Sequence, residues 1–217
     1  MNPALCLRRE TPADSRAVEE LTREAFWNYH SPGCDEHYLV HTLRNADVFI
    51  PALDFVAELY GKLAGNIMYA ISRIALDAGG DLPVITFGPL SVLPACQKQG
   101  VGGALVRHTL GLAKTMGFSA VLIYGDPVYY SRFGFLPAEH YGIAGEDNEY
   151  RAALQAVELK PGALENAAGR FLEGSVYHID PAAAAAFDQA FPLKDKRSGT
   201  PSQQRFLEIL AMHKPRG

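Results

Sequence analysis

The sequence predicts a mixed α/β fold in which helices pack against one mixed sheet. Strand-like and helix-like segments alternate along residues 4–140. A strong amphipathic pattern covers residues 102–116, and a short, continuously apolar segment follows at residues 120–124, which is typical of a buried parallel strand. Together these observations predict one right-handed parallel crossover between residues 82 and 124.

The N-terminal elements follow from capping residues and apolar spacing. Residues 4–10 predict a first strand. The segment Thr11-Pro12-Ala13-Asp14 predicts a helix start, because Thr11 can cap the helix and Asp14 can return the bond. Apolar residues at helical spacing extend this helix to about Trp27, and Asp35 predicts the cap of a second helix that ends near Arg44.

A hairpin and a longer strand come next. Phe49 to Tyr60 and Lys62 to Ala75 predict two antiparallel strands joined by a tight turn at Gly61-Lys62. Leu82 to Leu93 predicts a third strand that Gly88-Pro89 interrupts. Proline has no N–H to donate and glycine beside it indicates a bulge, so this pair does not fit a regular central ladder.

The C-terminal third is less strongly patterned. We expect residues 1–145 to form the core of the protein and residues 146–217 to form an extension packed on it rather than a second domain. The elements expected there are strands over 152–159 and 171–179 and helices over 180–191 and 202–212.

Composition excludes several functional classes. The net charge of −4 does not favour nucleic-acid or membrane partners, which prefer basic surfaces. Three widely spaced cysteines predict reduced thiols rather than disulfides or a metal centre. The N-terminal residues show no signal-peptide pattern and no apolar run reaches the length of a membrane span, so we expect a cytoplasmic protein. A homodimer is compatible with these observations.

The most informative segment is the glycine-rich loop Gln97–Gly103, which follows a strand and opens the strongest predicted helix. Glycine lets the backbone approach a ligand closely. The first N–H groups of a helix have no partner within the helix, and the helix dipole adds positive charge there. Such a helix start binds phosphate groups, and Lys98 adds charge at the rim.

Two other phosphate-binding motifs do not fit this loop. No Lys-Ser or Lys-Thr follows the glycines, as a Walker A loop requires. Gly100 and Gly102 match the first two glycines of a dinucleotide fingerprint, but Leu105 occupies the third position. A glycine-rich helix start without any ligand remains the alternative.

Two ordered motifs resemble the GNAT superfamily of N-acetyltransferases. The segment Gln97-x-x-Gly100-x-Gly102 resembles that family's Gln/Arg-x-x-Gly-x-Gly/Ala motif, and Leu90-x-Val92-x-Pro94 fits the strand before it. Downstream, the segment Gly125–Phe135 resembles the family's Tyr-x-x-x-Gly-Phe block. One helix and one strand separate the two blocks, as the family requires.

The resemblance implies a GNAT-like acyl-CoA N-acyltransferase fold, with two central parallel strands that splay apart around acetyl-CoA as co-substrate. Gly88-Pro89 stands where the bulge that opens the gap would fall. The resemblance assigns pantetheine and acetyl contacts to Leu90, Ser91 and Val92, and pyrophosphate contacts to Gln97, Lys98, Gln99, Gly100, Val101, Gly102 and Gly103.

The implied reaction is attack of a neutral amine on a thioester. It needs oriented reactants, donors for the oxyanion and a proton for the departing thiolate. A backbone N–H near Val92 is the expected oxyanion donor. By resemblance Tyr130 is the catalytic acid, Tyr129 is its nearest rival, and a purely packing role is the alternative for Tyr130.

The general base is not evident. Some family members carry a glutamate on the strand before the motif, whereas residues 84–93 contain neither a carboxylate nor a histidine. Asp126 is better explained as a helix cap. Four residues of the first two helices and their connection, none of which we rank as catalytic, are Glu24, His30, Glu36 and His37.

The sequence therefore predicts an acetyl-CoA-dependent N-acetyltransferase acting on a small-molecule or peptide amine. The alternative is a non-catalytic acyl-CoA-binding regulatory module, against which the intact tyrosine block weighs. A nucleotide-binding switch is disfavoured because the Lys-Ser/Thr pair is missing.

Overall fold

The computed structural model describes residues 4–217 and divides into two compact units, each built from three chain segments. Among the described residues, unit 1 contains residues 4–69, Gly88–Thr109 and Ser175–Gln204, and unit 2 contains Ala70–Phe87, Leu110–Gly174 and Arg205–Gly217. Strands β3 (Lys62–Leu76) and β4 (Asp81–Val92) contribute residues to both units. The expected boundary after residue 145 stays a prediction.

Unit 1 contains the N-terminal hairpin and the second half of β4. Strand β1 (Leu5–Arg9) pairs antiparallel with β2 (Phe55–Leu59), and β2 pairs antiparallel with β3. Leu59 lies opposite Lys62. The two turn residues are therefore Tyr60 and Gly61, both with positive φ (54° and 73°), and not Gly61-Lys62 as expected.

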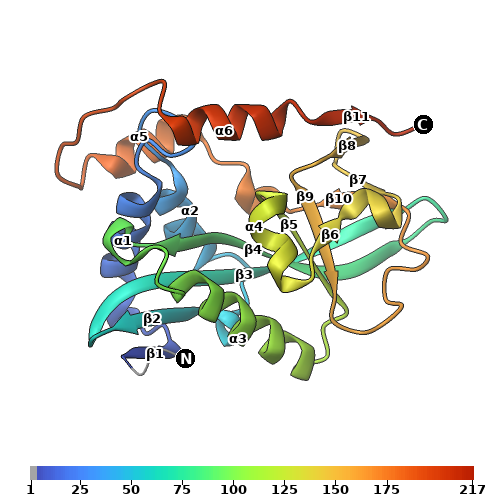
Figure 1. The fold of residues 1–217 in the computed structure, drawn as a ribbon, viewed down its shortest axis with the longest axis horizontal. Coiled ribbons are helices and arrows are strands. Elements are labelled where there is room, and N and C mark those ends of the chain that lie inside the picture. Colours follow the sequence, from blue (N-terminus) through green and yellow to red (C-terminus); the bar gives the residue numbers. More distant parts are fainter. Residues whose placement is uncertain (1–3) are drawn as a thin grey trace. The chain divides into compact units, whose positions relative to one another are not determined.

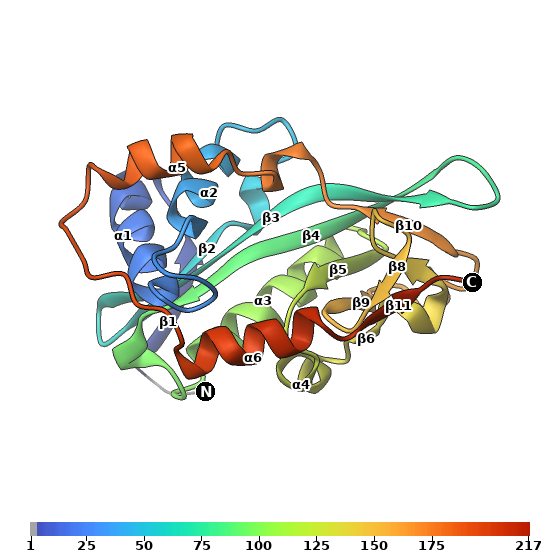
Figure 2. The ribbon, with the colours of Figure 1, turned by 90° about the horizontal axis from the view of Figure 1, so that it is seen from above.

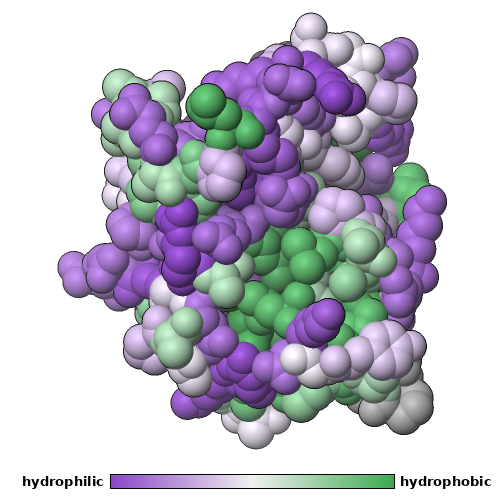
Figure 3. Space-filling view, turned by 90° about the vertical axis from the view of Figure 1, so that its left-hand side faces the viewer, coloured by the Kyte–Doolittle hydropathy of each residue, from purple (hydrophilic) through white to green (hydrophobic). Residues whose placement is uncertain are grey.

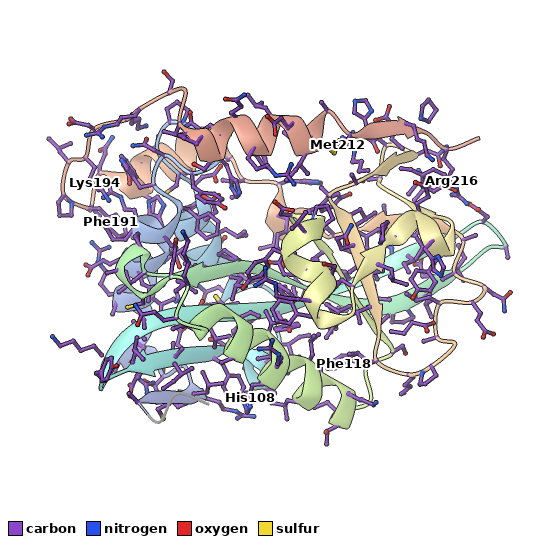
Figure 4. The ribbon with its side chains drawn as sticks, viewed as in Figure 1. His108, Phe118, Phe191, Lys194, Met212 and Arg216 are labelled. Carbon is purple, nitrogen blue, oxygen red and sulfur yellow. The ribbon has the colours of Figure 1, made fainter. Side chains whose placement is uncertain are left out.

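Three helices gather in unit 1, as Figure 2 shows: α1 (Ser15–Phe26), α2 (Glu36–Leu43) and α5 (Pro181–Asp188). They are joined by Asp188, whose carboxylate accepts from Arg23 Nε at 2.6 Å and lies 3.1 Å from His37 Nε2. Phe191, labelled in Figure 4, packs against the His37 ring and lies under the Arg16 guanidinium. The segment after α5 is thereby fixed to α1 and α2.

One predicted strand and one predicted helix begin differently in the structure. Residues 49–54 do not form a strand, because a 3₁₀ turn at Pro51–Leu53 begins at a proline that cannot donate to a ladder. The first helix is preceded by a 3₁₀ turn, Pro12–Asp14, whose predicted capping box is present. Asp14 Oδ2 accepts from the Thr11 backbone N–H at 2.8 Å, and Arg8 also binds this carboxylate.

Unit 2 contains the parallel crossover. Helix α3 (Val101–Thr115) ends in this unit and leads to β5 (Ala120–Tyr124). Strand β5 pairs parallel with β4 and antiparallel with β9 (Leu154–Glu158), and β9 pairs with β6 (Leu136–Pro137), so that β5, β9 and β6 lie side by side in Figure 1. The remaining elements are α4 (Pro127–Tyr130), β7 (Ile143–Ala144), β8 (Glu149–Arg151), β10 (Gly169–Leu172), α6 (Pro201–Leu210) and β11 (His213–Pro215).

The expected C-terminal elements are partly corrected. The strand expected over 171–179 is the shorter β10, because Gly174 adopts a φ of 111° and a 3₁₀ turn follows at Ser175–Tyr177. Asp180 caps α5 through its bond from the Ala182 N–H at 2.9 Å, but the helix ends at Asp188 rather than Phe191. The pairs β6–β9 and β8–β11 were not expected from the sequence.

One apolar cluster forms the core of unit 2. Strands β3, β4, β5, β9 and β10 all contribute to it. Its buried members are Ile74, Val84, Ala120, Leu122, Ala138, Ile143, Leu154, Ala156, Leu164, Ala167 and Phe171. Burying these side chains is the main driving force for assembling the unit.

Hydrophilic residues dominate the face seen in Figure 3, on which hydrophobic residues gather at one hollowed area. Within residues 4–217 no helix is both long enough and apolar enough to span a membrane.

Candidate active site

The glycine-rich loop lies in unit 1 between a short 3₁₀ turn, Pro94–Cys96, and helix α3. Gly100 has a φ of 87°, a conformation that favours glycine, and its carbonyl accepts the first helical bond from Ala104 at 2.9 Å. The N–H groups of Val101, Gly102 and Gly103 therefore have no partner within the helix. The loop has the backbone arrangement of an anion-binding helix start.

Side chains of the loop hold it in place. Gln97 Nε2 donates to the Val92 carbonyl at 3.2 Å, and Gln99 Nε2 donates to the Ala95 carbonyl at 2.9 Å. Gln97, the first residue of the motif, thus ties the loop back to the end of β4. Lys98 has a positive φ of 59° and is exposed, so its ammonium group is available to an anion.

The strand segment assigned to pantetheine also lies in unit 1. The Ser91 hydroxyl is buried and shares a 2.9 Å hydrogen bond with Thr22 of α1. Its side chain is thereby occupied, whereas Leu90 and Val92 point to the other side of β4 by alternation. The backbone of Leu90–Val92 is what the segment can offer to an extended ligand.

The two parallel strands meet at one point and then separate. Among the described residues, β4 and β5 share one paired position, Ile85 opposite Val121, within unit 2. Strand β4 continues through the cis peptide bond Gly88–Pro89 to Val92, so the predicted interruption of the strand is not seen. No further pairing of the two strands follows among the described residues, as expected of strands that diverge.

Helix α4 positions Tyr130 in unit 2. Asp126 Oδ1 accepts from the Val128 N–H at 2.8 Å, which is the predicted cap, and Arg205 binds the same carboxylate. This bonding lowers the pKa of Asp126 despite its burial, so Asp126 is an ionised cap rather than a base. Gly134, with a φ of 87°, ends the segment.

Aromatic rings surround Tyr130. Its ring centroid lies 5.8 Å from that of Phe87 on β4 and 5.6 Å from that of Phe135. Gly125 is pressed against the same ring, since a β-carbon there would lie 2.2 Å from Tyr130 Cε2. The guanidinium carbon of Arg132 lies over the ring of Tyr129, 4.6 Å from the ring centroid. Tyr130 is thus packed against Phe87 of strand β4.

The residues of the first helices that we did not rank as catalytic make structural contacts. His37 is fully buried beside Asp188, and burial lowers its pKa. His30 Nδ1 lies 2.8 Å from Glu36, and Glu24 accepts from Lys194 at 2.8 Å. Among residues 4–217 no group of three or more His, Cys, Asp and Glu side chains is placed to hold a metal ion.

One titratable residue of unit 2 has no signal in the sequence. Glu173 directly follows β10 and is half-buried, and burial raises the pKa of its carboxyl to about 7. Nothing in the local sequence Phe171-Leu172-Glu173-Gly174 signals this environment, because β10 is placed by its pairing with β3, a strand distant in sequence.

Comparison with known proteins gives one consistent result. The model of the acetyltransferase (GNAT) family matches residues 16–135. The Escherichia coli protein YhbS, an uncharacterized N-acetyltransferase, is 30% identical over 165 residues, which cover 76% of this chain and 93% of YhbS. Escherichia coli YjhQ, also an uncharacterized N-acetyltransferase, is 35% identical over 126 residues, or 58% of this chain and 66% of YjhQ.

Solved structures agree with the sequence relatives. The structure of Escherichia coli YhbS in complex with CoA has a TM-score of 0.71 and 28% identity, covering 82% of this chain and 96% of that one. A GNAT family acetyltransferase from Brucella melitensis in complex with acetyl-CoA has a TM-score of 0.63 and 27% identity, covering 80% and 97%. This protein therefore belongs to the acetyltransferase (GNAT) family.

Proposed function

We propose that this enzyme transfers the acetyl group of acetyl-CoA to a primary amine by direct attack of the amine on the thioester. The observation that carries the proposal is the start of α3, where unpaired N–H groups follow the Gln97-x-x-Gly100-x-Gly102 motif. Related structures of the family hold CoA and acetyl-CoA, which supports the same co-substrate here.

The residues proposed to bind acetyl-CoA lie in unit 1 and act mainly through their backbone. The N–H groups of Val101, Gly102 and Gly103 bind the pyrophosphate, with Lys98 adding positive charge. The pantetheine arm pairs with the Leu90–Val92 backbone as an added strand would. The fixed Ser91 side chain supports this role, since its bond to Thr22 holds that backbone in place.

The reaction needs a proton donor for the thiolate that leaves. Tyr130 of unit 2 is proposed to supply it, because a phenol has a reference pKa near 10 and is neutral at pH 7. Its place on a capped helix and its contact with Phe87 support this role, since both restrict where the hydroxyl can point. We also propose that a backbone N–H near Val92 stabilises the oxyanion.

The N-acetyltransferase proposal is tested by two measurements on one preparation. Calorimetry measures acetyl-CoA binding, and thiol release is followed with a panel of polyamines, amino acids, aminoglycosides and peptides with free N-termini. Binding together with turnover of at least one amine supports the proposal. Binding without turnover of any amine favours the regulatory module, and absence of acetyl-CoA binding contradicts both.

The location of the protein in the cytoplasm and its assembly as a homodimer stay proposals. The use of acetyl-CoA and the reduced cysteine side chains are compatible with a cytoplasmic location. Size measurement by light scattering tests the second.

A further inference from the structure

The C-terminal residues of unit 2, Arg205–Gly217, form a largely exposed segment that we call the C-terminal strap. It contains the end of α6 and all of β11, which follow one another directly in Figure 1. At one end, Arg205 binds the Asp126 carboxylate, with Nε 3.1 Å from Oδ2 and Nη2 3.3 Å from Oδ1. Further along, the Met212 carbonyl accepts from the Ala152 N–H at 2.9 Å. The strap therefore joins the start of α4 to another part of unit 2.

The far end of the C-terminal strap is held without any help from α4. Strand β11 pairs antiparallel with β8, and His213 Nδ1 lies 2.7 Å from the Glu149 carboxylate on that strand. Arg216 Nη1 donates to the Gly169 carbonyl at 3.0 Å. Because backbone pairing and charged groups both anchor this end, the strap can serve as a fixed support for α4.

Asp126 binds the whole first turn of α4. Its side chain accepts from the Val128 N–H at 2.8 Å. Its backbone carbonyl accepts from the N–H groups of Tyr129 at 2.9 Å and Tyr130 at 3.1 Å. Helix α4 has four residues, and so short a helix has little stability of its own. The position of Tyr130 therefore depends on what holds Asp126 in place.

Arg205 is placed to hold the Asp126 side chain. Two nitrogens of the guanidinium group meet two oxygens of the carboxylate, an arrangement that sets orientation as well as distance. The backbone just before the cap is held separately, because the Gly125 N–H donates to the Ala153 carbonyl at 2.8 Å. Among the described residues, Arg205 supplies the one side chain that binds the Asp126 carboxylate. The guanidinium group thus restrains the start of α4.

We infer that Arg205 is a positioning residue of the reaction: through Asp126 it keeps α4 where the phenol of Tyr130 can protonate the departing thiolate. This inference rests on the proposed role of Tyr130. Arg205 itself exchanges no proton, because a guanidinium group stays charged in proteins. The family model matches residues 16–135, so Asp126 and Tyr130 lie within the matched part and Arg205 lies outside it. A residue of the C-terminal strap thereby serves the active site.

The exposure of the ion pair sets the size of the expected effect. The Arg205 side chain is 42% exposed and that of Asp126 is 33% exposed. Exposed ion pairs are weak and are screened by salt, so losing this one should loosen α4 rather than unfold it. A displacement of about 1 Å in a catalytic group costs about 10²-fold in rate. A looser restraint on a ring that still packs against Phe87 should cost less, about 3- to 10-fold in kcat.

The test measures kcat with saturating acetyl-CoA and an amine that the parent acetylates. We expect Arg205→Ala to lower kcat by about 3- to 10-fold and to leave the dissociation constant of acetyl-CoA unchanged. Arg205→Lys keeps the charge but not the two-pronged contact, so its kcat should lie between those of the parent and Arg205→Ala. Arg73→Ala is the matched control. It removes the same charge from another exposed ion pair of unit 2, with Asp81 at 3.3 Å, and should leave kcat unchanged.

Two further readouts separate positioning from a general loss of stability. The ratio of kcat between the parent and Arg205→Ala should fall toward one as NaCl approaches about 1 M, where charges are screened beyond about 3 Å. In a Tyr130→Phe background, Arg205→Ala should lower kcat by less than about 2-fold more, because the hydroxyl that it positions is already missing. A general loss of stability would lower kcat in both backgrounds alike.

The outcomes separate this inference from the proposed function. An active parent whose kcat survives Arg205→Ala unchanged overturns the role of Arg205 alone, and so does a loss that multiplies in full with that of Tyr130→Phe. A parent that acetylates no amine overturns the proposed function and this inference with it. Should Arg205→Ala fail to fold, Arg205→Lys decides: a lowered kcat with unchanged acetyl-CoA affinity supports the positioning role, and a parental kcat contradicts it.

Discussion

The ring of Tyr130 lies against the backbone of Gly125, so that a β-carbon at Gly125 would stand 2.2 Å from Cε2 and 2.6 Å from Cδ2 of that ring. Gly125 is the residue that joins β5 to the cap of α4. The absence of a side chain there allows the tyrosine to fold back over the end of the strand. The position of the proposed acid is thus set by a glycine that performs no chemistry.

Gly125→Ala should therefore reduce turnover by moving the Tyr130 ring. A displacement of about 1 Å in a catalytic group costs about 10²-fold in rate, which is the size of effect we expect in kcat. In a Tyr130→Phe background the same substitution should cost little more, because the group it displaces is already missing. Gly111→Ala, where a β-carbon meets open space, is the control and should leave kcat unchanged. If the losses in kcat from Gly125→Ala and Tyr130→Phe multiply in the double variant, Gly125→Ala does not act through Tyr130.

Tyr130→Phe tests the acid itself, because it removes the hydroxyl and keeps the ring packed against Phe87 and Phe135. We expect kcat to fall by roughly 10²- to 10⁴-fold, with acetyl-CoA affinity little changed. Tyr129→Phe should cost much less, since that ring is placed beside Arg132. Nearly full turnover by Tyr130→Phe, measured where chemistry limits the rate, would show that the proton comes from elsewhere.

Gly102→Val tests the phosphate-binding role of the loop. Gly102 lies in the first turn of α3, and valine forms helix better than glycine, so the variant should fold. A branched side chain should block the approach of phosphate to the backbone and remove at least one charge-assisted hydrogen bond, which weakens acetyl-CoA binding by about 10- to 100-fold. Calorimetry measures the change, and a folded variant that binds as tightly as the parent rules out this loop as the pyrophosphate site.

The buried carboxyl of Asp54 should make the free energy of unfolding depend on pH. This carboxyl is buried in unit 1, and burial together with the neighbouring Glu10 carboxylate raises its pKa above the usual value near 4. At pH values between the unfolded-state and folded-state pKa, Asp54 is protonated in the folded protein and ionised in the unfolded chain. Stability from this group is complete below about pH 4 and falls as pH rises toward the folded-state pKa, by up to about 1.4 kcal/mol per pH unit. Asp54→Asn should flatten this decline in urea titrations, and an unchanged slope would mean that another group causes it.

The sequence was sufficient where one local signal decides a structure. Helix α3, strand β5 and the Asp126 cap follow from apolar period, apolar content and a helix-start motif, and all three are present. The strand expected from Phe49 begins only at Phe55, because Pro51 starts a 3₁₀ turn. The turn at Tyr60–Gly61 lies one residue before its expected place. Strands of two or three residues, such as β6 and β7, carry too few side chains to show a period.

The candidate site divides in the same way. The loop after Gln97 and the block around Tyr130 are short motifs, so the sequence locates both. The half-buried position of Glu173 depends on the pairing of β10 with β3, which lies far away in the sequence. A glutamate at the end of β10 has no local signal that distinguishes it from an exposed one.

Acetylation of a primary amine is the reaction on which the proposed roles of the loop and of Tyr130 depend. The most direct measurement is mass spectrometry of each amine in the panel after incubation with enzyme and acetyl-CoA, in parallel with the release of free CoA. At least one amine is expected to gain a single acetyl group on nitrogen, with one CoA released per acetyl group. Acetyl-CoA binding with no acetylated product from any amine would contradict it.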